Sequence, residues 1–248
     1  MNSFFDSSPP LLSPRDIVTA LTRSTPEALQ LPRRAIITFN DGDVGYVLGR
    51  AGGKLVESWS PFKKIFLLDG SETVITRCYI GGPGIAALVE EFSAFGVEEF
   101  ILWGYCGAID RSLSIGDIVI ARGALREDGV SYHYMERDDA VIYPDWFETW
   151  EPLAKDRGFR DILIWSCDAI YRETAAKVAR YRETGVGAVE MEAASFYSVC
   201  DFKGLKGIVF LVVSDLLTGS AWQGGFRTKP FKEGVRGLAR FFLEHVVQ

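Results

Sequence analysis

The sequence of 248 residues predicts a single domain of the α/β class. Two observations favour this class: several short segments are apolar throughout, and segments with helical periodicity lie between them. Strands that are apolar along their whole length are buried on both faces, which requires helices on both sides of the sheet. A third observation concerns the number of domains. No Gly/Ser-rich linker or internal repeat divides the chain, and its 48% of apolar residues suffice for one large core.

The N-terminal segment, residues 1–32, is predicted to be an arm that precedes a domain of residues 33–248. Prolines and serines interrupt this arm, as in Ser8-Pro9-Pro10. Ser13-Pro14 favours the start of a short helix, because serine caps helix N-termini and proline suits the first helical position.

The remaining elements follow in order from the spacing of apolar residues. Short apolar runs predict strands at residues 35–39, 73–80, 100–103, 118–121, 162–165 and 208–213. Helical periodicity predicts helices at residues 85–95, 174–184, 193–200 and 231–247, the first of which stops at Gly96 and the second at Gly185.

Charge and hydropathy argue against several classes of protein. The chain has 27 Lys and Arg against 33 Asp and Glu, a net charge of −6, which is unlike a protein that coats nucleic-acid phosphates. No apolar run reaches the roughly 18 residues that span a bilayer, and the N-terminus lacks the basic start and apolar stretch of a secretory signal. We therefore expect a soluble, cytoplasmic protein that binds neither nucleic acid nor membranes.

Cysteine and histidine content argues against a metal centre. The four cysteines are far apart and lie beside apolar or aromatic residues, and no pair has the spacing of metal ligands; they are Cys78, Cys106, Cys167 and Cys200. We expect reduced, mostly buried thiols. With only two histidines in the chain, a histidine-rich metal site is not expected either.

A glycine turn, Gly82-Pro83-Gly84, separates a predicted strand from a predicted helix. Such a turn exposes backbone N–H groups at a helix N-terminus and favours an anion, so Gly82 and Gly84 are candidate anion-binding residues. Neither the Walker pattern nor the dinucleotide-binding pattern is present. A plain tight turn explains the same residues equally well.

A second pair of glycines, Gly104 and Gly107, follows the predicted strand 100–103. These glycines let a ligand approach the backbone closely at a carboxyl end of the sheet, where ligands of α/β proteins usually bind. The alternative is a tight strand-to-loop turn without a ligand.

Three acidic residues stand in apolar surroundings. Glu190 and Glu192 would face one side of a strand but lie about 200° apart on a helix. A glutamate there could simply favour a helix N-terminus, but a buried carboxylate needs hydrogen-bond donors, and ribose hydroxyls are suitable ones. Asp215 ends the apolar run 208–213, where loss of water favours its protonated form and a role as general acid; the alternative is a cap that starts a loop.

Five segments occur in an order and at spacings that carry a resemblance: Gly82-Pro83-Gly84-Ile85-Ala86-Ala87, Gly104-Tyr105-Cys106-Gly107-Ala108, Gly116-Asp117-Ile118-Val119, Val189-Glu190-Met191-Glu192-Ala193-Ala194 and Val213-Ser214-Asp215. Together they resemble the nucleoside phosphorylase/nucleosidase superfamily, which includes bacterial purine nucleoside phosphorylase, uridine phosphorylase and methylthioadenosine nucleosidase. The resemblance covers roughly residues 35–245, and its specific part is the Glu-Met-Glu-Ala-Ala segment with the downstream Ser-Asp.

The resemblance implies a mixed central β-sheet, partly barrel-like and flanked by helices, that cleaves the N-glycosidic bond of a nucleoside. It implies no cofactor or metal, with inorganic phosphate possible as a co-substrate. It also implies a homo-oligomer, a dimer or a trimer of dimers, in which a neighbour completes each pocket. Three aromatic residues that look exposed, Trp59, Phe62 and Phe66, would suit such an interface.

The sugar side of the site follows from the same resemblance. Glu192 would accept hydrogen bonds from the ribose hydroxyls, with Glu190 beside it and Met191 packed against the sugar. His133 belongs to a segment that lies near the sugar in some members, although a surface position is an equal alternative.

The resemblance also implies which residues bind the base. Asp215 matches the acid that protonates a leaving purine at N7. Ile170 and Tyr171 match residues that stack on the base. Gly104 and Tyr105 would contact the substrate at the strand end.

The phosphate site departs from the family pattern. Asn40-Asp41-Gly42-Asp43 stands where phosphorylases have a Gly-Asp-Pro-x-x-Arg-like loop, and Leu102 and Tyr105 stand where they have an arginine and a serine. Asp43 falls about where nucleosidases of the family place the acidic residue that activates water. The acceptor, phosphate or water, therefore stays open, and a non-catalytic nucleoside-binding relative is the alternative function.

Overall fold

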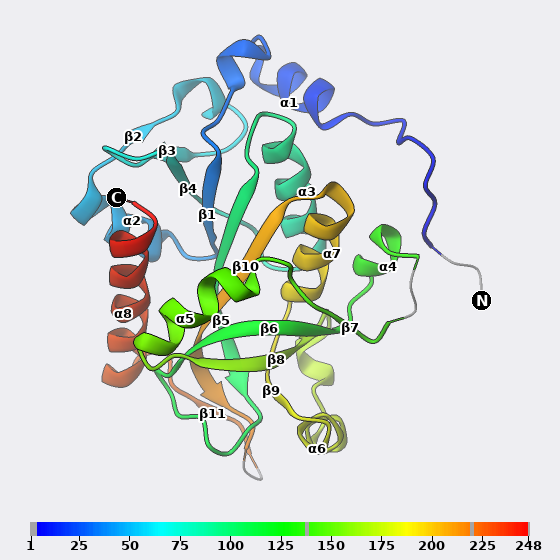
Figure 1. Cartoon of the computed structure of the whole chain (residues 1–248), viewed down its shortest axis with the longest axis vertical. Coiled ribbons are helices and arrows are strands. Elements are labelled where there is room, and N and C mark those ends of the chain that lie inside the picture. The colour runs from blue at the N-terminus through cyan, green and yellow to red at the C-terminus, as the bar shows by residue number, and fades with distance from the viewer. Residues whose placement is uncertain (1–3, 137–138, 219–220, 248) are drawn as a thin grey trace.

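The computed structural model of the chain describes residues 4–136, 139–218 and 221–247. Within these ranges a mixed eleven-stranded sheet has the order β11-β10-β6-β8-β9-β5-β1-β4-β3-β2, with β7 paired to β6 (Figure 1). The strands are β1 (Arg34–Thr38), β2 (Lys54–Leu55), β3 (Ile65–Leu67), β4 (Thr73–Arg77), β5 (Glu99–Ala108), β6 (Ile118–Glu127), β7 (Val141–Ile142), β8 (Arg160–Cys167), β9 (Val186–Glu190), β10 (Lys206–Leu216) and β11 (Gln223–Gly224).

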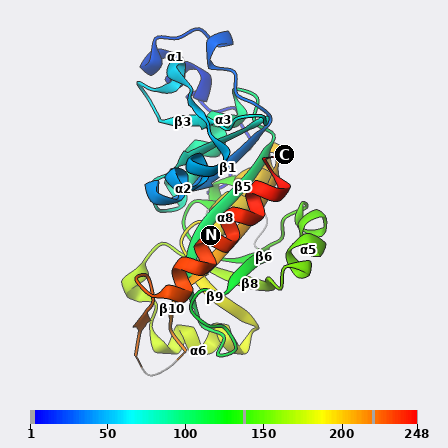
Figure 2. The same cartoon turned by 90° about the vertical axis from the view of Figure 1, so that its left-hand side faces the viewer.

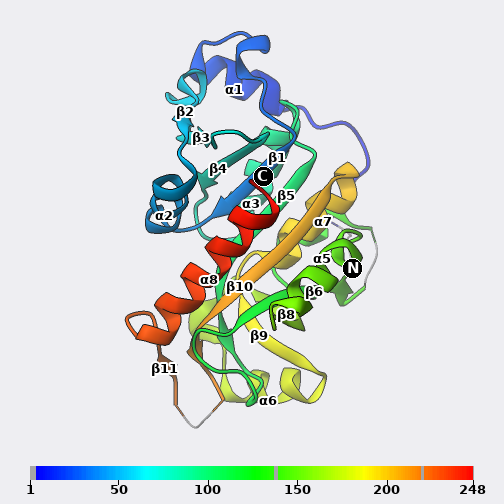
Figure 3. The same cartoon turned by 60° about the vertical axis from the view of Figure 1, so that its left-hand side comes forward.

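Helices cover both sides of this sheet (Figures 2 and 3). They are α1 (Pro14–Thr22), α2 (Asp41–Ala51), α3 (Gly82–Ser93), α4 (Ser131–Tyr134), α5 (Phe147–Asp156), α6 (Ala175–Glu183), α7 (Ala193–Lys203) and α8 (Lys229–His245). One core cluster lies under α3 and α7, with Val89 and Phe196 at its centre. A second lies under α2, α5 and α8, with Val47, Trp150 and Phe242. The predicted α/β class, with helices on both faces, is confirmed.

Part of the sheet closes on itself. The long strand β5 pairs with β10 along its length and with β9 near its end. Strand β10 also pairs with β6, β6 pairs with β8, and β8 pairs with β9, so these five strands form a ring. Strands β1, β4, β3 and β2 extend from β5 as an open wing. This is the partly barrel-like sheet that the resemblance implied.

The predicted elements all occur, with shifted ends. Ser13 caps α1, with Pro14 at the first helical position, and Thr174 caps α6. The strand predicted at 73–80 ends at Arg77. Helix α3 begins at Gly82, so the predicted glycine turn is the first turn of the helix. Helix α1 lies within residues 1–32 and packs against α3, and the division of the chain at residue 32 stays a prediction.

The turn alternative for Gly104 and Gly107 is wrong, and residues 40–43 do not form the loop that the resemblance implied. The pair Gly104 and Gly107 lies inside β5, which continues to Ala108. A Cβ at Gly107 would lie 2.5 Å from Leu217 Cδ1, so glycine there permits close packing within a strand. Residues 40–43 are the start of α2, where Asn40 accepts a hydrogen bond from the N–H of Gly42 at 2.7 Å.

The three aromatics predicted for an interface differ in their burial. Trp59 is fully buried, and its Nε1 donates to the carbonyl oxygen of Leu29 at 2.8 Å. Its ring also packs edge-on against Phe92. Phe62 and Phe66 are partly buried against the two core clusters. The prediction of an exposed side chain is therefore wrong for Trp59. Phe62 and Phe66 are partly exposed and line a surface hollow, so a role of these two in an interface stays a prediction.

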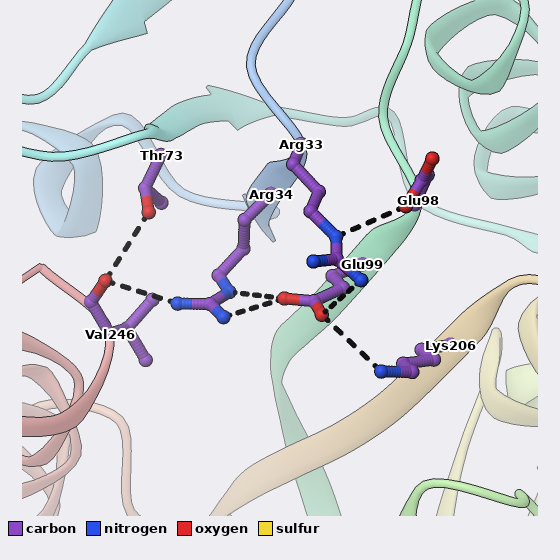
Figure 4. A network of polar contacts seen from close by, with 7 residues as sticks. All are labelled: Arg33, Arg34, Thr73, Glu98, Glu99, Lys206 and Val246. Atoms are coloured by element: carbon purple, nitrogen blue, oxygen red, sulfur yellow. Dashed lines mark hydrogen bonds and ion pairs between the residues drawn. The ribbon is translucent and has the colours of Figure 1, made fainter.

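The amino ends of the parallel strands are held together by an ionic network around one buried carboxylate, that of Glu99 (Figure 4). Glu99 is buried at the start of β5 and accepts from Arg34 Nη2 and Nε at 2.6 and 2.9 Å. Arg33 and Lys206 lie 3.4 and 3.5 Å from the same carboxylate, and Arg34 also donates to the carbonyl of Val246 after α8. Burial alone would raise the pKa of Glu99, but the hydrogen bonds and charges of these cations outweigh it and lower the pKa. This network joins β1, β5, β10 and α8 at the amino ends of the strands, and the opposite ends of the strands lie at the candidate site.

The four cysteines are free and buried, as predicted. Among the residues that the structure describes, no helix is long and apolar enough to cross a membrane.

Candidate functional site

A cavity of about 220 Å³ lies at the carboxyl ends of β1, β5 and β10, next to the end of β9. Seven of the residues predicted for the site line it: Gly104, Tyr105, Ile170, Glu190, Met191, Glu192 and Asp215. Three larger hollows, of about 630, 600 and 360 Å³, are lined by none of the predicted site residues. The structure therefore brings these seven residues together at one cavity, and their roles stay a prediction.

Glu190 is held entirely by groups of the chain. Its Oε1 accepts from the Ser166 hydroxyl of β8 at 2.5 Å, and its Oε2 accepts from the N–H groups of Glu192 and Ala193 at 2.7 and 2.8 Å. The side chain thus joins β8 to the N-terminus of α7. Burial raises the pKa of Glu190 despite these donors.

Glu192 occupies the position before α7 and lines the cavity. Its Oε1 accepts from the N–H of Gly81, the residue before α3, at 2.5 Å. Burial raises the pKa of Glu192, and the charge of Glu190 raises it further. The two residues share neither one strand nor one helix, because Glu190 ends β9 and Glu192 precedes α7. The alternative that a glutamate favours a helix N-terminus fits Glu190, whose carboxylate accepts from N–H groups at the start of α7.

The predicted anion-binding glycines do not line this cavity. The N-terminus of α3 is instead bound to the carboxylate of Glu192 through Gly81. Gly82 packs against α7, since a Cβ there would lie 2.3 Å from Ser195 Oγ, and a Cβ at Gly84 would lie 2.9 Å from the carbonyl oxygen of Tyr79. Close packing accounts for both glycines.

Asp215 lies near the end of β10, beside Gly107 of β5. Its Oδ1 accepts from the hydroxyl of Ser214 at 2.6 Å, and its Oδ2 accepts from the indole Nε1 of Trp222 at 2.8 Å. Trp222 itself is 64% exposed, so this partner of Asp215 lies at the surface. Nothing in the sequence pointed to Trp222.

Asp43 is buried directly behind the cavity wall. Its Oδ2 accepts from the Tyr105 hydroxyl at 2.6 Å and from Thr38 Oγ1 at 3.1 Å, and both of these residues line the cavity while Asp43 does not. Burial raises the pKa of Asp43, an effect that the two hydrogen bonds partly offset. Burial and the neighbouring Asp43 likewise hold the pKa of Tyr105 above its usual range. The Asp43 carboxylate is therefore linked to the cavity by hydrogen bonds from two hydroxyl groups that line it.

Two predicted contact residues lie elsewhere. His133 is exposed on α4, where its ring stacks on Phe4 at a centroid distance of 5.2 Å. Tyr171 is 96% exposed, whereas its neighbour Ile170 lines the cavity. The cavity wall as described includes neither His133 nor Tyr171.

Sequence reasoning assigned no role to another acidic residue, Glu173, which also lines the cavity. Its carboxyl group is about half buried, and burial together with the charge of Asp215 raises its pKa to about 7. Four carboxyl groups thus surround the cavity in two neighbouring pairs, Glu190 with Glu192 and Asp215 with Glu173.

The described wall of the cavity has neither a cationic side chain nor a cluster of metal ligands. No Lys or Arg is among the described residues that line it. No group of three or more His, Cys, Asp or Glu in the described ranges is placed to hold a metal ion. The site can accept hydrogen bonds from hydroxyls and supply protons from acids, and the residues described along its wall offer no side-chain cation to a dianion.

Comparison with protein families gives a match over most of the chain. Residues 34–242 match the model of the phosphorylase superfamily. Guanosine phosphorylase from Halorubrum lacusprofundi is 34% identical over 157 residues, which cover 61% of this chain and 65% of that protein. A DeoD-type purine nucleoside phosphorylase from Colwellia psychrerythraea is 32% identical over 66% of this chain and 73% of its own length. Uridine phosphorylase from Escherichia coli is 27% identical over 56% of this chain and 62% of its own length. The matched residues thus make up less than two thirds of the length of the guanosine phosphorylase and of the uridine phosphorylase.

Solved structures share the fold. Purine nucleoside phosphorylase from Toxoplasma gondii, in complex with immucillin-H, superposes with a TM-score of 0.75 at 17% identity, over 90% of this chain and 92% of that one. Uridine phosphorylase from Vibrio fischeri superposes with a TM-score of 0.73 at 19% identity, over 88% and 92% of the two chains.

Proposed function

The chain belongs to the phosphorylase superfamily, and on that premise we propose that it cleaves the N-glycosidic bond of a purine nucleoside with water as the acceptor. The observation that carries this proposal is the cavity itself. Carboxyl groups line it in two pairs, its described wall lacks cationic side chains, and a buried aspartate lies behind it. The relatives named guanosine and purine nucleoside phosphorylase support a purine as the base.

The carboxyl groups suit the charges that develop in this reaction. Breaking the bond builds positive charge on the ribose and leaves an electron pair on the base. We assign the ribose hydroxyls to Glu192, with Met191 against the sugar and Ile170 against the base. Asp215, when protonated, gives its proton to N7 as the base departs with the bonding electrons. General acid catalysis of this kind contributes about 10²–10⁴ in rate.

Water completes the reaction at C1′ of the ribose. We propose that the attacking water passes a proton to the Tyr105 oxygen while the Tyr105 hydroxyl proton moves to Asp43. The hydrogen bond of 2.6 Å between these two side chains supports this route. A phosphate dianion, in contrast, would meet Tyr105 backed by a carboxylate and no cationic side chain in the described wall, which is electrostatically unfavourable.

The decisive measurement is the rate of base release against phosphate concentration, with the sugar product identified. We expect a change in kcat/KM of less than about twofold, with free ribose as the product, because phosphate takes no part in the transition state. Saturable phosphate dependence with ribose 1-phosphate as the sole sugar product would contradict the assignment of water. Nucleoside binding without base release would contradict catalysis altogether.

We also propose that the protein forms a homo-oligomer, a dimer or a trimer of dimers. Apolar side chains of three residues at the cavity, Ile80, Ile170 and Phe226, are 70%, 53% and 49% exposed, and those of Tyr79 and Trp222 nearby are also exposed. Monomers rarely leave such clusters uncovered. Light scattering should therefore give two or more times the chain mass of 27.6 kDa. A fully active species of 27.6 kDa would show that activity does not require an oligomer.

A further inference from the structure

Trp222 belongs to a hairpin that ends beside Asp215, the acid of the proposed reaction. Strand β11 pairs antiparallel with the end of β10, and Gly224 of β11 stands directly opposite Asp215. Trp222 immediately precedes β11, and the six-membered ring of its indole lies against Gly224, where a Cβ would be only 2.5 Å from Trp222 Cη2. A residue without a side chain at position 224 therefore lets the indole lie beside Asp215.

The indole N–H reaches the carboxyl group of Asp215 from outside the nucleoside cavity. Trp222 Nε1 donates to Asp215 Oδ2 at 2.8 Å. Trp222 lines the neighbouring hollow of about 360 Å³ and is not among the described residues that line the cavity, whereas Asp215 is. An indole N–H is a donor only, so it can stabilise a carboxylate but cannot take a proton from an acid. Trp222 can thus support Asp215 without competing with the base for the cavity.

The negative charge of ionised Asp215 is poorly compensated within the described part of the chain. The other donor to its side chain is the Ser214 hydroxyl, whose oxygen also lies 3.1 Å from the carbonyl oxygen of Cys106, so its single proton has two acceptors. The described cavity wall holds no Lys or Arg, and Glu173 is close enough for the charge of Asp215 to raise its pKa. An anion at Asp215 therefore depends strongly on the indole N–H.

We propose that Trp222 is a positioning residue for the acid: its indole N–H stabilises the carboxylate that Asp215 becomes as its proton passes to N7 of the base. In this step the O–H bond of Asp215 breaks, the N7–H bond forms, and the bond between base and ribose breaks with its electron pair left on the base. The hydrogen bond from Trp222 meanwhile changes from one to a neutral acid into the stronger, charge-assisted kind, which lowers the barrier. The inference rests on the proposed function for the acid role of Asp215.

Trp222→Phe keeps an aromatic ring against Gly224 and removes the donor. It should lower kcat for guanosine by about 10-fold with little change in KM, because a hydrogen bond to a charged group is lost. Each protein is assayed at its own pH optimum, so that differences in protonation do not enter the comparison. In Asp215→Asn, which transfers no proton, adding Trp222→Phe should change kcat by less than about twofold. Tyr143→Phe, at an exposed aromatic residue outside the cavity, is the control and should behave as the wild type.

A second variant displaces the indole without replacing it. Gly224→Ala places a methyl group where the ring lies and should push the indole N–H away from Asp215. We expect kcat to fall by at least about threefold, and the same change should add little to the loss in Trp222→Phe. Gly49→Ala is the matched control, because Gly49 is exposed on α2 and no atom lies within 4 Å of the added Cβ.

The outcomes separate this inference from the proposed function. If Trp222→Phe causes no loss, or an equal loss in the wild type and in Asp215→Asn, the role of Trp222 is wrong and the cleavage stands. If no nucleoside is cleaved, the proposed function is wrong, and the indole N–H resonance of Trp222, assigned by its absence from the NMR spectrum of Trp222→Phe, decides whether Trp222 holds Asp215. Movement of this resonance in Asp215→Ala supports the contact, and an unchanged position overturns it.

Discussion

Asp215→Asn is expected to reduce kcat for purine nucleoside cleavage by on the order of 10²-fold or more, because asparagine has no proton to give to N7 of the leaving base. The amide is nearly the same size as the carboxyl group. Its oxygen can still accept from Ser214 or Trp222, the two donors that hold Asp215 in place. The loss should therefore fall on kcat, with KM changed much less.

The measurement is steady-state release of free base, together with thermal unfolding to verify the fold. Asp156→Asn, at the exposed end of α5, is the matched control and should behave as the wild type. Near-wild-type turnover of purine nucleosides by Asp215→Asn would remove Asp215 from the mechanism.

The secondary structure that the sequence predicted correctly is the part that local pattern determines. Strands such as β1 and β10 are apolar along most of their length, and α8 alternates apolar and polar residues at helical spacing. Helix α2 was missed because it contains three glycines and two aspartates, which disfavour helix in isolation. Its stability comes from tertiary packing of Val44 and Val47 against the core.

Glycine misled the interpretation of β5 for a related reason. A glycine inside an apolar run usually signals a turn or a bulge. Here the neighbours that require glycine, Leu211 at Gly104 and Leu217 at Gly107, come from about 110 residues further along the chain. No local pattern contains that information. The burial of Trp59 has the same origin, since its partners are Leu29 and Phe92.

The candidate site was predictable where a polar residue interrupts an apolar stretch, as Glu190, Glu192 and Asp215 do. The partners of these carboxylates were not predictable, because Ser166 and Gly81 lie 24 and 111 residues from the glutamates they bind. Glu173 and Trp222 were missed because each stands in a polar segment, where a charged or aromatic residue is ordinarily a surface residue.

Asp43→Asn best discriminates between water and phosphate as the acceptor, because the two acceptors predict opposite changes in the rate of base release. If Asp43 receives the proton of the attacking water, its replacement should lower the rate of base release by about 10²-fold. If phosphate is the acceptor, removing a buried negative charge behind Tyr105 should weaken the repulsion of the dianion and raise activity at low phosphate. Asparagine keeps an oxygen that can accept from Tyr105 and Thr38, so the cavity wall should retain its shape.

The controls for this experiment come from the same part of the chain. Asp41→Asn lies in the same helical turn, but its side chain is 82% exposed and paired with Arg77, so activity should not change. Tyr105→Phe removes the hydroxyl that links Asp43 to the cavity and should reproduce most of the loss caused by Asp43→Asn.

The pH dependence adds an independent criterion for the role of Asp43. A general base works only when ionised, so kcat/KM should fall as the pH drops through the pKa of Asp43. Burial raises that pKa, so this limb should lie at higher pH than the value near 4 that is usual for aspartate. In Asp43→Asn the remaining activity should lose this limb, and a limb that persists unchanged in the variant would assign the titration, and the activation of water, to another group.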